Sequence, residues 1–161
     1  MINSFASKVI AATSLMALSV RAGHYQLGGE DHVRLRFNAD NHFKIMQVTD
    51  IHLGEQPLTN PALTAMVKDF VEKEQPDFVA VTGNVVAGQV YHALHPKWWF
   101  SYAFAFFLML NDAGVPHSFV AGYHDYEGDA NEGEMLHLED YWPLSLTKMN
   151  DFTRYGKGLD H

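Results

Sequence analysis

The fold is decided by the stretch Phe43-Lys-Ile-Met-Gln-Val-Thr-Asp-Ile-His52. Its first seven residues predict a strand, and Asp50 and His52 follow at the start of a loop. In an extended segment, side chains two residues apart project to the same side. A carboxylate oxygen and an imidazole nitrogen are ligands that suit iron, zinc or manganese. The pair therefore indicates a metal-binding loop, although Asp-x-His alone also suits a capping Asp beside a surface His.

Apolar patterning before this stretch predicts a second strand. Residues 32–37 alternate apolar and polar side chains, as a half-buried strand does. The intervening residues 38–41 are typical of a turn. We therefore expect 32–37 and 43–49 to pair as a hairpin.

Strands and helices alternate after the stretch. Asn60 and Pro61 form a helix-start signal, with Asn60 as the N-cap. The predicted elements are a helix at 61–74, a buried strand at 78–81, an aromatic-rich helix at 98–111, a strand at 117–121 and helical turns at 134–141. This β-α-β-α-β order predicts an α/β fold with a mostly parallel sheet and right-handed crossovers.

The loops that leave parallel strands lie along one edge of a sheet, where ligands bind. Here these loops are 49–52, 82–84 and 121–125. Gly83 and Gly122 allow the backbone to approach a ligand closely, although both also suit a plain turn. We therefore expect side chains separated by more than 70 positions to converge there.

His124 and Asp125 suit a general acid in which the carboxylate orients the imidazole. A surface pair without a function is the alternative for these two residues. Their place in the third loop joins them to the same predicted site.

Composition excludes several classes of protein. The chain has 161 residues, of which 47% are hydrophobic and 19% are charged, so it is not intrinsically disordered. Lys and Arg number 11 against 19 Asp and Glu, and the net charge of -8 argues against nucleic-acid binding. The chain contains 10 His and no Cys, which leaves Asp and His as the metal ligands.

The first 22 residues read as a signal peptide. Lys8 precedes the apolar stretch 9–20, which is short for a membrane-spanning helix. Small residues precede Gly23, where a mature, secreted or extracytoplasmic chain would begin. An ordinary N-terminal helix is the alternative. The predicted domain is then 23–161, with no stable membrane span.

Three motifs resemble those of the calcineurin-like metallophosphoesterases, and most closely the purple-acid-phosphatase-like branch. They are Phe43-Lys-Ile-Met-Gln-Val-Thr-Asp-Ile-His52, Pro76-Asp-Phe-Val-Ala-Val-Thr-Gly83 and Ala121-Gly-Tyr-His-Asp125. The family pattern is D-x-H, then G-D, then G-N-H-[DE], followed by further His segments that end in G-H-x-H. The resemblance implies a layered metallophosphoesterase-like fold and a two-metal site that directs a metal-activated water at a phosphate ester.

The resemblance also assigns roles to individual residues. It implies that Asp50 and His52 bind one metal ion, that position 84 bridges two ions, and that position 123 binds the second. It makes His124 the residue that protonates the leaving group, held by Asp125. The metals it implies are iron, zinc or manganese.

The chain departs from the family pattern at these positions. Asn84 stands where the family has Asp, so the bridging charge is missing. Tyr123 stands where the family has Asn, and we expect it to fill the second metal pocket. Ala87 falls near the Tyr that colours purple phosphatases. The later His segments are absent, so we expect a domain without the C-terminal half of the family fold, holding two metal ions as the resemblance implies or one instead of two.

Three further features have more than one reading each. His92 and His95 have the spacing of a helical metal pair, but their loop context favours solvated side chains. The stretch 98–110 is apolar nearly all round, which suits the core or a surface for self-association. The acidic residues Glu127, Asp129, Glu132 and Glu134 suit a solvated loop, a substrate-selecting lip or a calcium site.

Two functions follow from these observations. The first is a metal-dependent phosphoesterase acting on small phosphate esters. The second is a catalytically silent relative that acts as a binding or interaction module, or a truncated fragment.

Overall fold

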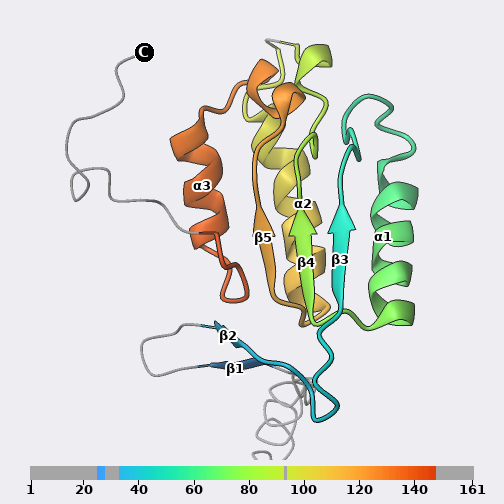
Figure 1. Cartoon of the computed structure of the whole chain (residues 1–161). Helices are drawn as coiled ribbons and strands as arrows, with labels where there is room; N and C mark the ends of the chain where they lie inside the picture. Colours follow the sequence, from blue (N-terminus) through green and yellow to red (C-terminus); the bar gives the residue numbers. More distant parts are fainter. Residues whose placement is uncertain (1–24, 28–32, 93, 148–161) are drawn as a thin grey trace, which may run out of the picture.

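The computed structural model describes residues 25–27, 33–92 and 94–147, and the predicted signal peptide lies outside them. The chain forms five strands, three α-helices and two short 3-10 helices in this part (Figure 1). In order they are β1 (Tyr25–Leu27), β2 (Val33–Leu35), β3 (Ile45–Val48), α1 (Asn60–Glu74), β4 (Phe78–Val81), η1 (Gly88–Val90), α2 (Trp98–Asp112), β5 (His117–Phe119), η2 (Tyr123–Glu127) and α3 (Glu132–Asp140).

A parallel sheet with the order β3-β4-β5 forms the centre of the domain. Val79 of β4 lies between Met46 of β3 and His117 of β5. The three strands point the same way, so the loops that follow them meet at the upper edge in Figure 1. The predicted α/β fold with a mostly parallel sheet is confirmed.

The predicted hairpin between 32–37 and 43–49 is wrong. β2 pairs antiparallel with β1, whereas β3 pairs in parallel with β4. Between them the side chain of Asn38 accepts hydrogen bonds from the N–H groups of Asp40 (3.0 Å) and His42 (2.7 Å), which turns the chain. The backbone of β3 instead pairs with the apolar strand β4. The alternation of apolar and polar residues alone could not reveal this pairing.

The helix predicted at 61–74 is confirmed as α1, but its cap differs. Thr59 is the N-cap residue, and Asn60 begins the helix. The side-chain oxygen of Asn60 instead accepts a hydrogen bond from the N–H of Gly54 (3.1 Å), which ties the preceding loop to the helix. At the other end, Gln75 adopts a left-handed conformation (φ 51°) and donates to the carbonyl of Val71.

The described sheet is covered by helices on one face. Val48, Val79 and Val81 are buried in the core shared with α1, α2 and α3. On the opposite face Ile45 is 60% exposed, and Val120, just after β5, is 66% exposed. The described residues therefore form two layers, with the core between sheet and helices.

The aromatic stretch 98–110 forms α2, the central helix of the core. Asp129 caps its N-terminus by accepting hydrogen bonds from the N–H groups of Trp98 (2.8 Å) and Trp99 (3.0 Å). Gly114 follows the helix with a φ of 67°, as its position in the sequence predicts. The side chains it buries are Trp99, Ala103, Phe106, Phe107, Met109 and Leu110.

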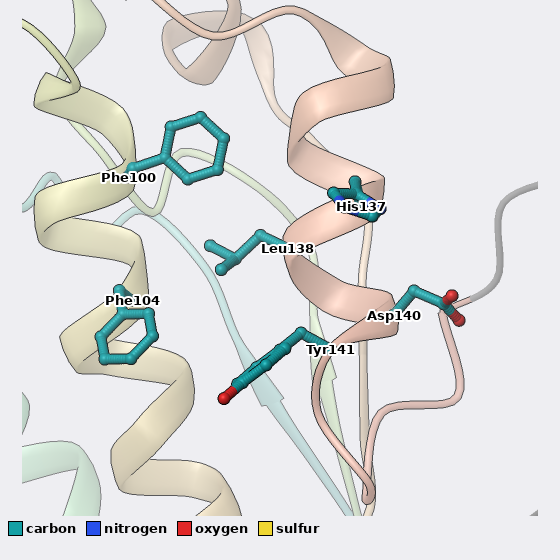
Figure 2. A pocket seen from close by; sticks show the side chains of 6 residues that line it. All are labelled: Phe100, Phe104, His137, Leu138, Asp140 and Tyr141. Carbon is teal, nitrogen blue, oxygen red and sulfur yellow. The ribbon is translucent and has the colours of Figure 1, made fainter.

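The prediction of self-association through 98–110 is not supported, because most of these aromatic side chains pack inside the domain. Phe100 and Phe104 of this stretch line a pocket of about 290 Å³ between α2 and α3 (Figure 2). No helix in the described ranges has the length and apolar character needed to cross a bilayer.

A buried polar pair joins α3 to β5. The imidazole of His117 and the carboxyl of Glu139 are both fully buried, with Nε2 and Oε2 3.8 Å apart. Burial lowers the pKa of His117 to about 4 and raises the pKa of Glu139 to about 8. The hydroxyl of Ser145 donates a hydrogen bond to Glu139 (2.9 Å), and His117 stacks on the ring of Phe107.

The substitution Glu139→Gln tests this burial. The folded state holds the Glu139 proton more tightly than the unfolded state, so this contribution to stability is lost as pH rises from about 4.5 through about 8. Gln has no proton to lose, and His117 titrates in both proteins. The unfolding free energy of the variant relative to the natural chain should therefore rise between pH 5 and 8, by about 1 kcal/mol per pH unit. Urea unfolding at several pH values measures it.

Asp69→Asn, an exposed carboxyl on α1, is the matched control and should show a flat difference across this pH range. An equally flat difference for Glu139→Gln would contradict the buried, protonated carboxyl.

Candidate functional site

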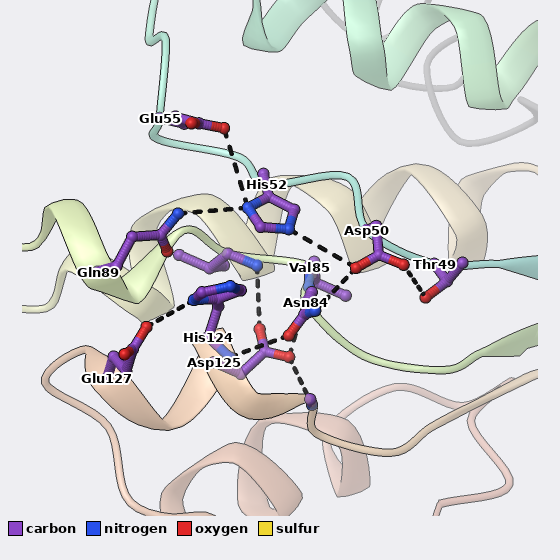
Figure 3. A network of polar contacts seen from close by, with 12 residues as sticks. Thr49, Asp50, His52, Glu55, Asn84, Val85, Gln89, His124, Asp125 and Glu127 are labelled. Carbon is purple, nitrogen blue, oxygen red and sulfur yellow. Dashed lines mark hydrogen bonds and ion pairs between the residues drawn. The ribbon is translucent and has the colours of Figure 1, made fainter.

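The three predicted loops converge at the carboxyl edge of the sheet (Figure 3). The N–H of Asp50 donates to the carbonyl of Gly83 (3.1 Å), and the N–H of His52 donates to the carbonyl of Asn84 (3.0 Å). The N–H of His124 donates to the side-chain oxygen of Asn84 (2.9 Å). The second loop therefore binds both of its neighbours, and residues 32 to 40 positions apart become adjacent.

Two glycines make this close approach feasible. A Cβ atom on Gly83 would lie 2.6 Å from the Cα of Gly122, and Gly83 has a φ of 102°. A Cβ atom on Gly122 would collide with the side-chain oxygen of Asn84. Both glycines are therefore required by the contact between loops, a more specific reason than a plain turn.

The sequence predicts an extended backbone at Asp50 and His52, but the loop is not extended. Asp50, His52 and Asn84 adopt left-handed conformations with φ of 55°, 51° and 52°. Such conformations are uncommon for residues other than glycine and persist where surrounding contacts impose them. The side chains of Asp50 and His52 nevertheless approach each other, with Oδ1 and Nε2 3.7 Å apart.

Asn84 forms a hydrogen bond with the predicted metal-binding carboxylate. Its Nδ2 donates to Oδ1 of Asp50 (2.8 Å), while Thr49 donates to Oδ2 (2.8 Å). These two hydrogen bonds hold the pKa of Asp50 below its usual range, and the bond from Asn84 has the larger effect. Asp50 is therefore a hydrogen-bonded carboxylate.

The environment of His52 includes two residues that the motif did not identify. Glu55 lies with Oε2 3.9 Å from Nδ1 of His52, and Nε2 of Gln89 lies 3.4 Å from the same nitrogen. The His52 and His124 rings lie 5.0 Å apart between centroids. Both imidazoles therefore share one cluster with Asp50.

The predicted orientation of His124 by Asp125 is wrong. Nδ1 of His124 lies 2.6 Å from Oε2 of Glu127, three residues later on the 3-10 helix η2. Asp125 is fully buried, and its carboxylate accepts hydrogen bonds from backbone N–H groups of three residues and from one indole. The donors are Val85 (3.4 Å), Val86 (3.0 Å), Gly122 (2.9 Å) and Nε1 of Trp99 (3.2 Å). Asp125 thus joins the loops to the core.

For Glu127 the sequence left three readings open: a solvated loop, a substrate-selecting lip or a calcium site. Its spacing of three residues from His124 would have placed it beside the ring, had the segment been recognised as helical. Asp129 and Glu134 also have individual roles, because Asp129 caps α2 and Glu134 forms a capping box with Asn131. Glu127, Glu132 and Glu134 are nevertheless exposed, in agreement with the solvated reading of this loop.

Tyr123 does not fill a metal pocket, contrary to expectation. Its side chain is 74% exposed, and its ring meets the ring of His124 edge to face, with the centroids 5.3 Å apart. Ala87 is fully buried. Outside this cluster, the His92 and His95 rings lie 6.4 Å apart, and both residues are exposed.

The residues present do not fit a two-metal centre. In the described part of the chain, no three His, Asp or Glu side chains are grouped as a metal would require. Asp50 and His52 supply one carboxylate and one imidazole, whereas Asn84 directs an N–H group at Asp50. Iron, zinc or manganese would find two of the predicted ligands, Asp50 and His52, in place.

Comparison with known proteins identifies the family. The model of the calcineurin-like phosphoesterase family matches residues 43–160. The chain belongs to the calcineurin-like phosphoesterase family. It is 28% identical over 160 residues to "Probable inactive purple acid phosphatase 14" of Arabidopsis thaliana, and 24% identical over 155 residues to "Probable inactive purple acid phosphatase 28" of the same plant. The resemblance seen in the three motifs is thereby confirmed.

The two plant phosphoesterase relatives are much longer than this chain. The first alignment covers 91% of this chain and 39% of the relative, and the second covers 83% and 36%. The chain therefore spans less than two fifths of the length of either relative.

Substituting Gly122 by alanine tests the contact between loops. The new methyl group would collide with Asn84, so we expect a loss of about 1–3 kcal/mol in unfolding free energy, measured by urea denaturation. Gly128→Ala is the control, because its Cβ would meet its nearest atoms at 3.7 Å or more. Equal effects of the two substitutions would contradict the tight contact.

Proposed function

We propose that this domain is a catalytically silent member of the phosphoesterase family, which keeps the loops of the site without hydrolysing phosphate esters. The observation that carries the proposal is the hydrogen bond from Nδ2 of Asn84 to Asp50. The word "inactive" in the names of the two plant relatives agrees with it.

The orientation of the Asn84 amide is fixed by its surroundings. Its oxygen accepts the N–H of His124, so a reversed amide would bring two donors together. The amino group must then face Asp50, where a bridging carboxylate would have offered an oxygen. A cation bound to Asp50 would face this amino group, and the hydrogen bond between Asn84 and Asp50 would be lost.

The missing charge adds to this effect. Two divalent cations about 4 Å apart repel strongly, and a bridging carboxylate offsets that repulsion. Asn84 is neutral and cannot do so. We therefore propose that the domain binds one metal ion at most, through Asp50 and His52.

A second candidate function is a metal-dependent phosphoesterase acting on small phosphate esters. The gathering of Asp50, His52 and His124 at one edge favours it, together with the contact that steadies His124 through Glu127. In this reading His124 would hold the proton for the leaving group. The bound metal ion would supply the activated water.

Turnover separates the two candidates. The purified chain, incubated with an aryl phosphate and with iron, zinc or manganese, should release product no faster than the metal ion alone. Metal content should be one ion per chain or less by elemental analysis. Metal-dependent turnover that is lost on His124→Ala would overturn the silent reading and favour the phosphoesterase.

Restoring the family residues should raise metal affinity. Asn84→Asp with Tyr123→Asn brings back the bridging charge and an amide ligand, so we expect metal affinity to rise about tenfold or more in calorimetric titration. Asn41→Asp adds the same charge in a distant exposed turn and is the control. No gain over this control would show that ligands outside this chain limit the site.

We also propose that residues 1–22 are a signal peptide and that the protein is secreted. The mature chain should begin near Gly23 in N-terminal sequencing after expression in a secretory host. A mature chain that still begins at Met1 would count against secretion.

A further inference from the structure

A groove between α1 and α2 is a feature of the described surface that the proposed site does not use. It has a volume of about 640 Å³ and adjoins a second cavity of about 600 Å³. The two share Pro57, Ser101 and Tyr102 as walls, so they form one continuous depression around the Tyr102 ring. Small-molecule pockets commonly have volumes of about 300–1,000 Å³.

Small side chains leave space between the two helices at this groove. Ala65 of α1 faces it from one side, and Ser101 and Ala105 of α2 face it from the other. Leu53 and Met109 supply an apolar surface and are both largely buried. An apolar chain could therefore lie between the helices without displacing a bulky side chain.

The groove is less acidic than the rest of the molecule. The chain has a net charge of -8, yet no Asp or Glu is among the described residues that line either cavity. Lys68 lines the first cavity, and His92 and His95 line the second. Lys68 also forms an exposed ion pair with Glu72 (3.6 Å), a type of contact that contributes little. The lining therefore favours a negatively charged ligand.

Two buried hydrogen-bond donors in the groove wall have no partner. Asn60 is only 9% exposed, and although its oxygen accepts from Gly54, its Nδ2 is unpaired. Nε1 of Trp98 is likewise buried and unpaired. Leaving such donors without an acceptor is costly, and a ligand oxygen would offset that cost once the Asn60 amide turned toward the groove.

We propose that this groove binds an anionic amphiphile, a molecule with a carboxylate or phosphate head and an apolar chain. The head would lie near Lys68, and the apolar chain would lie along Ala65, Ala105 and Met109. The proposal is independent of hydrolysis at the carboxyl edge of the sheet.

Calorimetry with ligands that differ only in their heads tests the proposal. Decanoate and decyl phosphate, kept below micelle-forming concentrations, should both bind the purified chain. Decanol and decyltrimethylammonium should bind at least about tenfold more weakly, because they lack the negative charge. Equal binding of all four would overturn the proposal, whereas binding of only one anion would identify the head group.

Two substitutions locate the binding. Lys68→Gln should weaken decanoate binding about fivefold, and Lys73→Gln, on the same helix outside the groove, should leave it unchanged. Ala105→Trp should abolish binding by filling the groove, with the fold checked by circular dichroism. Ala105 is exposed, so the larger ring can be accommodated without disturbing the core. Unchanged binding in both Lys68→Gln and Ala105→Trp would place the ligand elsewhere and overturn the proposal.

Discussion

The carboxyl edge of the sheet depends on the hydrogen bonds of the Asn84 side chain. The side-chain amide of Asn84 donates to Asp50 of the first loop and accepts from the backbone N–H of His124 in the third. The backbone carbonyl of Asn84 accepts from the N–H of His52. One neutral residue therefore binds both neighbouring loops through hydrogen bonds. The same bonds direct a donor at the carboxylate of Asp50, which under the proposed function lowers the affinity of this position for a metal ion.

The buried carboxylate of Asp125 extends this arrangement into the core. It accepts four N–H groups, among them that of the Trp99 indole on α2, and so couples the edge of the sheet to the helix beneath it. A carboxylate without these donors would be costly to bury. Asp125, Glu127 and Asp129 lie close together in sequence, yet they support the loops, the His124 ring and the start of α2 respectively.

Much of the fold was predictable from periodicity, because α1, α2 and β4 have apolar patterns that match their length and burial. The pairing of β3 was not predictable, since its residues suit a hairpin as well as a parallel sheet. The helical turn at Glu127 escaped detection because its five residues lack an apolar period. The partner of His124 was consequently misassigned to Asp125, the nearer residue in sequence.

The sequence by itself determined the family, the alternation of strands and helices, and the loops that carry Asp50, His52, Asn84 and His124. These follow from local patterns and motifs, which need no knowledge of distant contacts. Only the tertiary structure decided that Asn84 turns its amino group to Asp50, that Tyr123 is exposed, and that α1 and α2 leave a groove between them. Each of these depends on atoms brought together from separate segments, and the direction of a hydrogen bond is set by the donors and acceptors that surround it in space.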